Sequence, residues 1–223
     1  MRIGVLGTGT VGRTLGSALL RSGHEVRLGS RTAGNEAAVA WAADVGGAAA
    51  SEGTFADAAG FGELVVNATA GAASLDALAL AGAEQLAGKV LVDVSNPLDT
   101  SGGMPPTLTV CNTDSVGEQI QRTYPDVRVV KALNTVTAKV MVDPSLVEGT
   151  HTIFVAGDDA QAKAEVGELL QEFGWPADSI LDVGDITSAR GMEMYVAMWI
   201  RLWGALGTPV LNVEVRSAGA QQA

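Results

Sequence analysis

Short apolar runs alternate with stretches of helical spacing along most of the chain. The runs are short enough to be buried strands, and they cover residues 1–6, 25–28, 64–67, 90–94, 127–131, 152–156 and 180–183. Apolar residues recurring at three- and four-residue intervals predict helices over 10–22, 35–43, 159–173 and 188–206. This alternation predicts an α/β fold: a Rossmann-type, doubly wound, mostly parallel sheet with a small C-terminal α/β extension that ends in a long apolar helix.

The pattern changes around Pro144, which places a domain boundary there. We predict a first domain over 1–145, a smaller one over 146–216 and a flexible tail over 217–223. The last predicted helix is apolar nearly all round, so the first domain, a partner subunit or a ligand has to cover it. We expect it to form the seam of a homodimer.

A glycine-rich turn follows the first predicted strand and opens the first predicted helix. Its residues fit the pattern G-x-G-x-x-G: Gly7, Thr8, Gly9, Thr10, Val11 and Gly12. In a dinucleotide site the first glycine permits the tight turn, the second lets a pyrophosphate approach the backbone, and the third lets helix and strand pack closely. The free N–H groups and the positive end of the helix dipole face the phosphates. We therefore predict a dinucleotide-binding loop here.

The residues after the second predicted strand indicate which dinucleotide binds. An NAD site has Asp or Glu at this place, but here the residues are Ser30, Arg31 and Thr32. An arginine with two neighbouring hydroxyls suits the 2′-phosphate of NADP, because a guanidinium donates several charge-assisted hydrogen bonds to phosphate. The alternative is that Arg31 is an ordinary solvated arginine.

Later strand ends supply further candidates for a ligand cleft, since ligands of doubly wound sheets bind beyond the carboxyl ends of the strands. Small residues and a proline suit a flat nicotinamide ring, and Asn134 could hold its carboxamide or orient an acceptor. The cofactor-binding candidates from these strand ends are Ala68, Thr69, Asn96, Pro97, Ala132 and Asn134. Each could equally be an ordinary strand-to-loop turn.

Composition removes several other classes of function. With 14 Lys and Arg against 25 Asp and Glu, the net charge of -11 argues against nucleic-acid and anionic-membrane binding. The chain starts with a strand-like segment, so we expect no signal peptide; the single cysteine suits a reducing compartment, and we expect a cytoplasmic protein. We predict no metal site, expect His24 and His151 to be structural, and expect Cys111 to be a packed thiol.

Four segments carry a family resemblance: GTGTVG at 7–12, GSR at 29–31, VVKALNT at 129–135 and DVGDITSARGMEM at 182–194. Together they resemble NADPH-dependent reductases of the deazaflavin coenzyme F420, and the resemblance covers essentially the full length. It implies hydride exchange between nicotinamide C4 and deazaflavin C5. It also implies that Arg190 and the apolar face around Met194 line the deazaflavin pocket. Our candidate catalytic residues are accordingly Asn134 and Arg190.

One feature departs from that family. The loop after Val130 carries Lys131 and Asn134, a form similar to the NADPH domains of ferric reductases, whereas the better-known deazaflavin enzymes have a histidine there. Alternatives to F420 as acceptor are therefore a free flavin, a ferric complex or a small carbonyl compound. A protein that senses NADPH without turning it over is a third hypothesis.

Two groups of residues in the sequence are ambiguous. The first could form a stacking wall for a flavin-like ring or could pack as a core or dimer seam: Trp175, Trp199, Trp203, Met192, Met194 and Met198. The second could meet an anionic second substrate or lie on a solvated surface: Lys131, Lys139 and Arg190.

Overall fold

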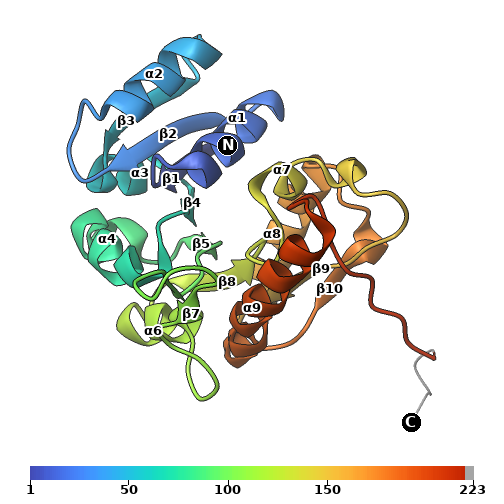
Figure 1. The fold of residues 1–223 in the computed structure, drawn as a ribbon. Coiled ribbons are helices and arrows are strands. Elements are labelled where there is room, and N and C mark those ends of the chain that lie inside the picture. Colours follow the sequence, from blue (N-terminus) through green and yellow to red (C-terminus); the bar gives the residue numbers. More distant parts are fainter. Residues whose placement is uncertain (219–223) are drawn as a thin grey trace.

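A single eight-stranded sheet organises the molecule (Figure 1). The structure is a computed structural model that describes residues 1–218. The strands are in the order β10-β9-β8-β5-β4-β1-β2-β3, and all neighbours are parallel except β8 and β9. Their bounds are β1 Arg2–Leu6, β2 Glu25–Ser30, β3 Ala50–Thr54, β4 Leu64–Asn67, β5 Val90–Asp93, β8 Arg128–Ala132, β9 Ile153–Ala156 and β10 Ile180–Asp182.

Helices cover both faces of this sheet, which explains the nearly continuous apolar strands. Alternate residues of each strand point to opposite faces: Val90 and Val92 join one core, and Leu91 joins the other. The first core contains side chains from α1 (Thr10–Arg21), α2 (Glu36–Val45), α7 (Ala138–Met141) and α8 (Ala160–Glu172). The second contains side chains from α3 (Phe55–Phe61), α4 (Ser74–Ala81), α5 (Ala83–Leu86) and α6 (Val116–Thr123).

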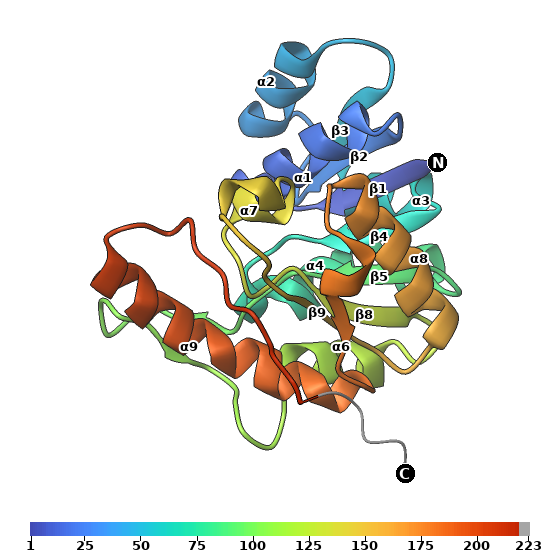
Figure 2. The ribbon, with the colours of Figure 1, turned by 90° about the vertical axis from the view of Figure 1, so that its right-hand side faces the viewer.

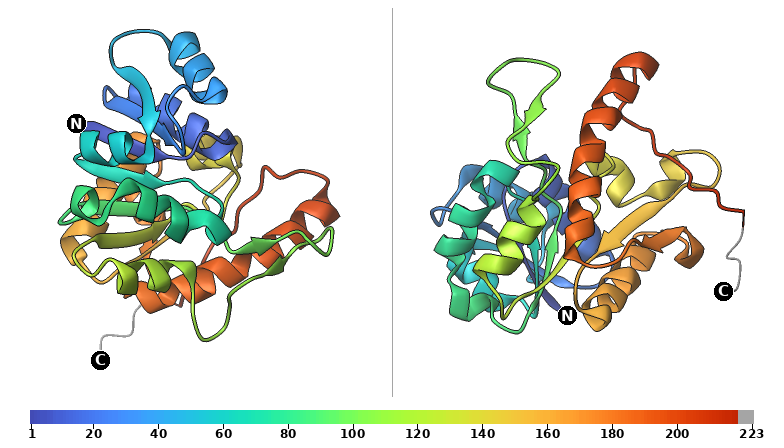
Figure 3. Two further views of the ribbon diagram at one scale, coloured as in Figure 1. Left: turned by 90° about the vertical axis from the view of Figure 1, so that its left-hand side faces the viewer. Right: turned by 90° about the horizontal axis from the view of Figure 1, so that it is seen from below.

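The last helix, α9 (Ala189–Leu206), leaves this three-layered body (Figure 2). Its first turns pack against α6, and its outer half projects away from the sheet beside an antiparallel hairpin of β6 (Leu98–Asp99) and β7 (Thr107–Leu108) (Figure 3). The hairpin and α9 together extend the edge at which the parallel strands end. Within residues 1–218, no helix combines the length and the apolarity that a membrane crossing needs.

The predicted fold class is confirmed, and the structure adds elements that the predicted ranges did not include: strand β3, helices α3 to α7, and the hairpin. Strand β3 has the sequence ASEGT, in which only Gly53 is buried, so it lacks an apolar run. The hairpin is too short and too exposed to give one. The domain boundary near residue 145 stays a prediction, since β9 and β10 beyond it join the same sheet as β8. Most of the predicted tail over 217–223 lies outside the described residues.

Candidate functional site

The glycine-rich loop between β1 and α1 has the geometry of an anion-binding turn. Gly7 has a φ of +120°, and a Cβ on it would lie 2.6 Å from the carbonyl oxygen of Ala68. A Cβ on Gly12 would lie 2.1 Å from the carbonyl oxygen of Gly7, so helix and strand meet here without room for a side chain. Gly9, the N-cap of α1, faces open space and has no side-chain cap. A phosphate therefore has free N–H groups and a clear approach.

Arg13, in the first turns of α1, was not among the residues that the sequence pattern singled out. Its guanidinium donates a hydrogen bond to the carbonyl oxygen of Thr8, within the glycine loop. It also lines a hollow with Thr10 beside that loop. A cation in this position complements a bound pyrophosphate. The sequence signal that could have indicated Arg13 is its position directly after Gly12, the third glycine of the motif.

The residues after β2 lie next to the glycine loop, because the N–H of Gly7 donates to the carbonyl oxygen of Gly29 over 2.9 Å. Arg31 and Thr32 are exposed there. The Ser30 hydroxyl, in contrast, donates to the Thr32 carbonyl oxygen and accepts from the Thr32 N–H, so it shapes the loop itself. A carboxylate also reaches this loop: Glu52 accepts from the N–H of Gly34 over 3.0 Å.

A cleft of about 490 Å³ opens beyond the carboxyl ends of the strands. It joins the start of α1, the ends of β4, β5 and β8, helix α7, the hairpin and the outer half of α9. None of the residues that line it within the described part of the chain is charged. Of the candidates from the sequence, the cleft brings together Thr10, Val11, Ala68, Thr69, Asn96 and Asn134. Ala132 and Pro97 are buried beside it and are not part of its lining.

Asn134 follows a residue with left-handed backbone, Leu133, at the end of β8. Its Nδ2 donates to Oδ1 of Asn96 over 2.9 Å and to the carbonyl oxygen of Met192, on α9, over 3.0 Å. Asn96 in turn donates to the Asn134 carbonyl oxygen over 2.8 Å. A carbonyl can only accept, so the amide nitrogen has to face Met192. Oδ1 of Asn134 is left buried without a partner among the described residues, ready to accept from an N–H group such as that of a carboxamide.

The aromatic residues of the C-terminal part separate into two groups. Trp199 and Trp203 line the cleft, with ring centroids 5.6 Å apart. Trp175 is 1% exposed in the core, where its Nε1 donates to the Met141 carbonyl oxygen over 3.0 Å. The stacking-wall interpretation therefore agrees with the places of Trp199 and Trp203, and the core interpretation holds for Trp175. Met194 and Met198 lie exposed on α9.

The three candidate cations do not meet in the cleft. Arg190 pairs with Glu118 of α6 through Nε at 2.8 Å, and it is not part of the cleft lining. This hydrogen-bonded pairing raises the pKa of Arg190 and lowers that of Glu118. Lys139 is exposed. Lys131 is 0% exposed, so both interpretations of it, as a ligand contact and as a surface residue, are wrong.

Several residues lie outside the cleft. Cys111 is exposed, so the expectation of a packed thiol is wrong: it lies in the loop after the hairpin. His24 contacts Oε2 of Glu172 over 2.6 Å, and His151 contacts the carbonyl oxygen of Pro144 over 3.0 Å, as side chains with structural roles do. In the described part of the chain, no cluster of three or more metal-ligating side chains occurs.

Comparison with known proteins identifies relatives for this architecture. The family described as NADP oxidoreductase, coenzyme F420-dependent, matches residues 2–97. A crystal structure of an Arthrobacter sp. FB24 protein, provisionally described as an F420-dependent NADP reductase, is 53% identical with a TM-score of 0.91. The match covers 97% of this chain and 100% of the Arthrobacter chain. The chain belongs to this family. It is thus an NADP-dependent oxidoreductase.

Two further relatives are more distant. Rat metalloreductase STEAP3 is 29% identical over 211 residues, which make up 94% of this chain but only 38% of the rat protein. An Aspergillus terreus reductive aminase in complex with NADPH has a TM-score of 0.66 at 19% identity, over 92% of this chain and 62% of the aminase chain, and shows the shared fold.

Proposed function

We propose that this chain transfers a hydride between NADP(H) and the deazaflavin coenzyme F420. One observation carries the proposal: a single cleft is lined both by the start of α1, next to the glycine loop, and by the tryptophans of α9. A dinucleotide held at the loop and a flat ring stacked on the tryptophans would share that space. The family membership and the Arthrobacter relative support the choice of F420.

The cleft, the glycine loop and the loop after β2 each have a role in this proposal. The glycine loop and Arg13 bind the pyrophosphate, and Arg31 binds the 2′-phosphate. Oδ1 of Asn134 accepts from the nicotinamide carboxamide, which fixes which face of the ring is presented. Trp199 and Trp203, whose ring planes lie at 49° to each other, would pack against the acceptor ring. When both are bound, the nicotinamide supplies a hydride at C4 and the deazaflavin accepts it at C5.

The uncharged lining favours a ring-to-ring hydride transfer. The chain contributes proximity and orientation, which on their own lower a barrier by about 7–11 kcal/mol in well-oriented systems. Reduction of a small carbonyl compound also requires a proton donor at the oxygen atom, and among residues 1–218 no acid, histidine or lysine lines the cleft. The likeness to rat STEAP3 makes a ferric complex the second candidate acceptor.

An acceptor panel tests the proposal. Purified protein with NADPH is mixed separately with F420, FMN and ferric citrate, and nicotinamide absorbance is followed. We expect turnover with F420 and little with the other two. Turnover with ferric citrate alone would assign the second candidate, and NADPH binding without any turnover would favour a sensor. Trp199→Ala is expected to raise KM for F420 while leaving NADPH affinity unchanged.

A further inference from the structure

A fully buried lysine lies beneath the cleft, where two strands meet α9. Nζ of Lys131, on β8, is 2.8 Å from Oδ2 of Asp93 on β5. It is also 2.6 Å from the carbonyl oxygen of Ser95 and 2.7 Å from Oε1 of Glu193 on α9. An ammonium group has three N–H bonds, so these three acceptors satisfy it completely. Asp93 is 0% exposed and Glu193 is 1% exposed, so the whole group is excluded from water.

Both carboxylates have further partners. Oδ1 of Asp93 accepts from Nδ2 of Asn67 over 2.8 Å and from the N–H of Ser95 over 3.2 Å. The two oxygens of Glu193 accept from the first two N–H groups of α6, over 2.9 and 3.1 Å. The positive end of α6 thus stabilises the negative charge that Lys131 alone does not balance. Burial opposes the ammonium most strongly, but the two carboxylates outweigh it and raise the pKa of Lys131.

This network is attached to two sides of the cleft. The backbone of Ser95 is held at both its N–H and its carbonyl oxygen, and Ser95 lines the cleft at the end of β5. On α9, the residue before the buried glutamate is Met192, whose carbonyl oxygen accepts from Asn134. Two turns further along α9 is Trp199. Lys131 therefore connects the floor of the cleft, formed by Ser95 and Asn134, to the tryptophan wall.

Stability alone does not require such a network. Replacing a buried ion pair by apolar residues of similar volume is often neutral or stabilising, whereas a fully satisfied pair fixes geometry. We propose that Lys131, through Asp93 and Glu193, is a positioning residue that sets the place of the α9 wall relative to the nicotinamide side of the cleft. This inference rests on the proposed function.

The test removes all three charges at once, so that no buried charge is left without a partner. The variant Asp93→Asn/Lys131→Met/Glu193→Gln is compared with the wild type and with Lys163→Met. Lys163 forms an ion pair of 2.8 Å with Asp182, and neither residue lines the cleft, so Lys163→Met controls for the loss of an ion pair elsewhere in the chain. We expect the triple variant to bind NADPH within about threefold of wild type and to lose about tenfold or more in kcat with F420. Its primary isotope effect with deuterated NADPH should rise, because the hydride step becomes slower.

A triple variant with unchanged kcat and isotope effect would overturn the proposal and leave the network as support for the fold alone. If the triple variant does not fold, the single variant Glu193→Gln, which keeps an acceptor for Lys131, takes its place. We expect a smaller loss of kcat in this variant, again with NADPH affinity nearly unchanged. An unchanged kcat in Glu193→Gln would also overturn the proposal. If the wild type turns over no acceptor, the proposed function fails separately. In that case a crystal structure of the triple or the single variant decides: α9 displaced from the sheet supports positioning, and α9 in place contradicts it.

Discussion

Two residues that line the cleft have a buried polar atom with no hydrogen-bond partner in the described structure. The amide nitrogen of Asn134 is fully used by Asn96 and Met192, and its Oδ1 is a buried acceptor with no partner among residues 1–218. Ser95 likewise has its backbone bound and its hydroxyl buried without a partner in the described structure. An unpaired buried polar atom costs about 1–3 kcal/mol, so atoms of this kind at a cleft indicate a ligand that pairs with them.

Arg31 is expected to determine the choice between the two nicotinamide dinucleotides. It is exposed, and a charge-assisted contact with the 2′-phosphate is worth about 1.5–3 kcal/mol, roughly ten- to a hundredfold in affinity. Arg31→Ala should therefore weaken NADPH at least about tenfold and leave NADH nearly unchanged, as isothermal titration calorimetry can measure. Equal losses for both nucleotides would refute the assignment. Glu52→Gln serves as a comparison variant, because the Glu52 carboxylate accepts a hydrogen bond from the same loop.

At the level of elements, three sides of helix α9 face three different parts of the molecule. Its first turns bind the N-terminus of α6 through Glu193, and its outer half carries the tryptophans of the cleft. A third side, with Met192 and Tyr195, lines a separate cavity of about 430 Å³. A helix that faces these three parts needs apolar residues nearly all round, which is the pattern in the sequence.

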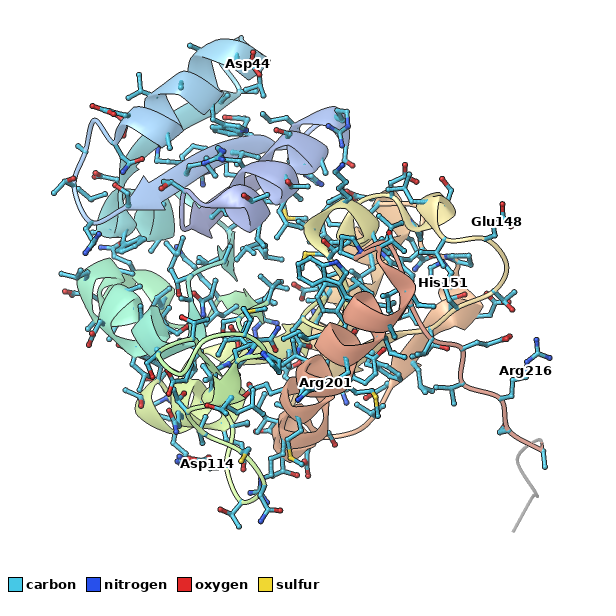
Figure 4. The ribbon with its side chains drawn as sticks, viewed as in Figure 1. Asp44, Asp114, Glu148, His151, Arg201 and Arg216 are labelled. Carbon is cyan, nitrogen blue, oxygen red and sulfur yellow. The ribbon has the colours of Figure 1, made fainter. Side chains whose placement is uncertain are left out.

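The loop before α6 gives a stability prediction that leaves the buried network untouched. Asp114 (Figure 4) accepts two hydrogen bonds of 2.9 Å from Arg122, and this pairing, aided by Gln119, lowers its pKa to about 2. Because the pKa of Asp114 is lower in the folded than in the unfolded chain, its pairing stabilises the fold fully above the unfolded-state pKa, near pH 4. This stabilisation is lost as the pH falls through 2. Asp114→Asn should therefore lower the free energy of unfolding by about 1 kcal/mol at pH 7 and by almost nothing at pH 2. The effect at pH 7 is small because Arg122 is largely exposed to solvent.

Urea unfolding of the two proteins at both pH values measures this difference. A cost that is the same at pH 2 and pH 7 would contradict the pairing.

The whole molecule presents an exposed apolar stripe where α9 projects. Met194, Met198 and Leu206 are 42%, 57% and 62% exposed, and their spacing of four and eight residues puts them on one side of the helix. We propose that a second copy of the chain covers this stripe in a homodimer. Analytical ultracentrifugation at micromolar concentration should give twice the monomer mass, and Met198→Asp should shift it towards monomer. A wild-type monomer would remove this idea.

The sequence was sufficient for the fold because the buried strands are continuous apolar runs, and it was sufficient for the glycine loop because that motif is local. It was not sufficient for Lys131. A lysine after two valines has the same sequence pattern whether its ammonium is solvated or is enclosed by carboxylates 38 and 62 residues away, as Asp93 and Glu193 are. Strand β3 was not predicted because a half-buried edge strand needs few apolar residues. The places of the tryptophans likewise depend on which side of α9 meets the cleft.

The most direct test of the account is to follow the hydrogen itself. NADPH carrying deuterium at C4 is incubated with the protein and F420, and the reduced deazaflavin is analysed by NMR. If both rings lie together in the cleft, deuterium from one face of the nicotinamide will arrive at C5 without exchange with water. Reduced deazaflavin whose added hydrogen at C5 comes from solvent, or no reduced deazaflavin at all, would contradict the account.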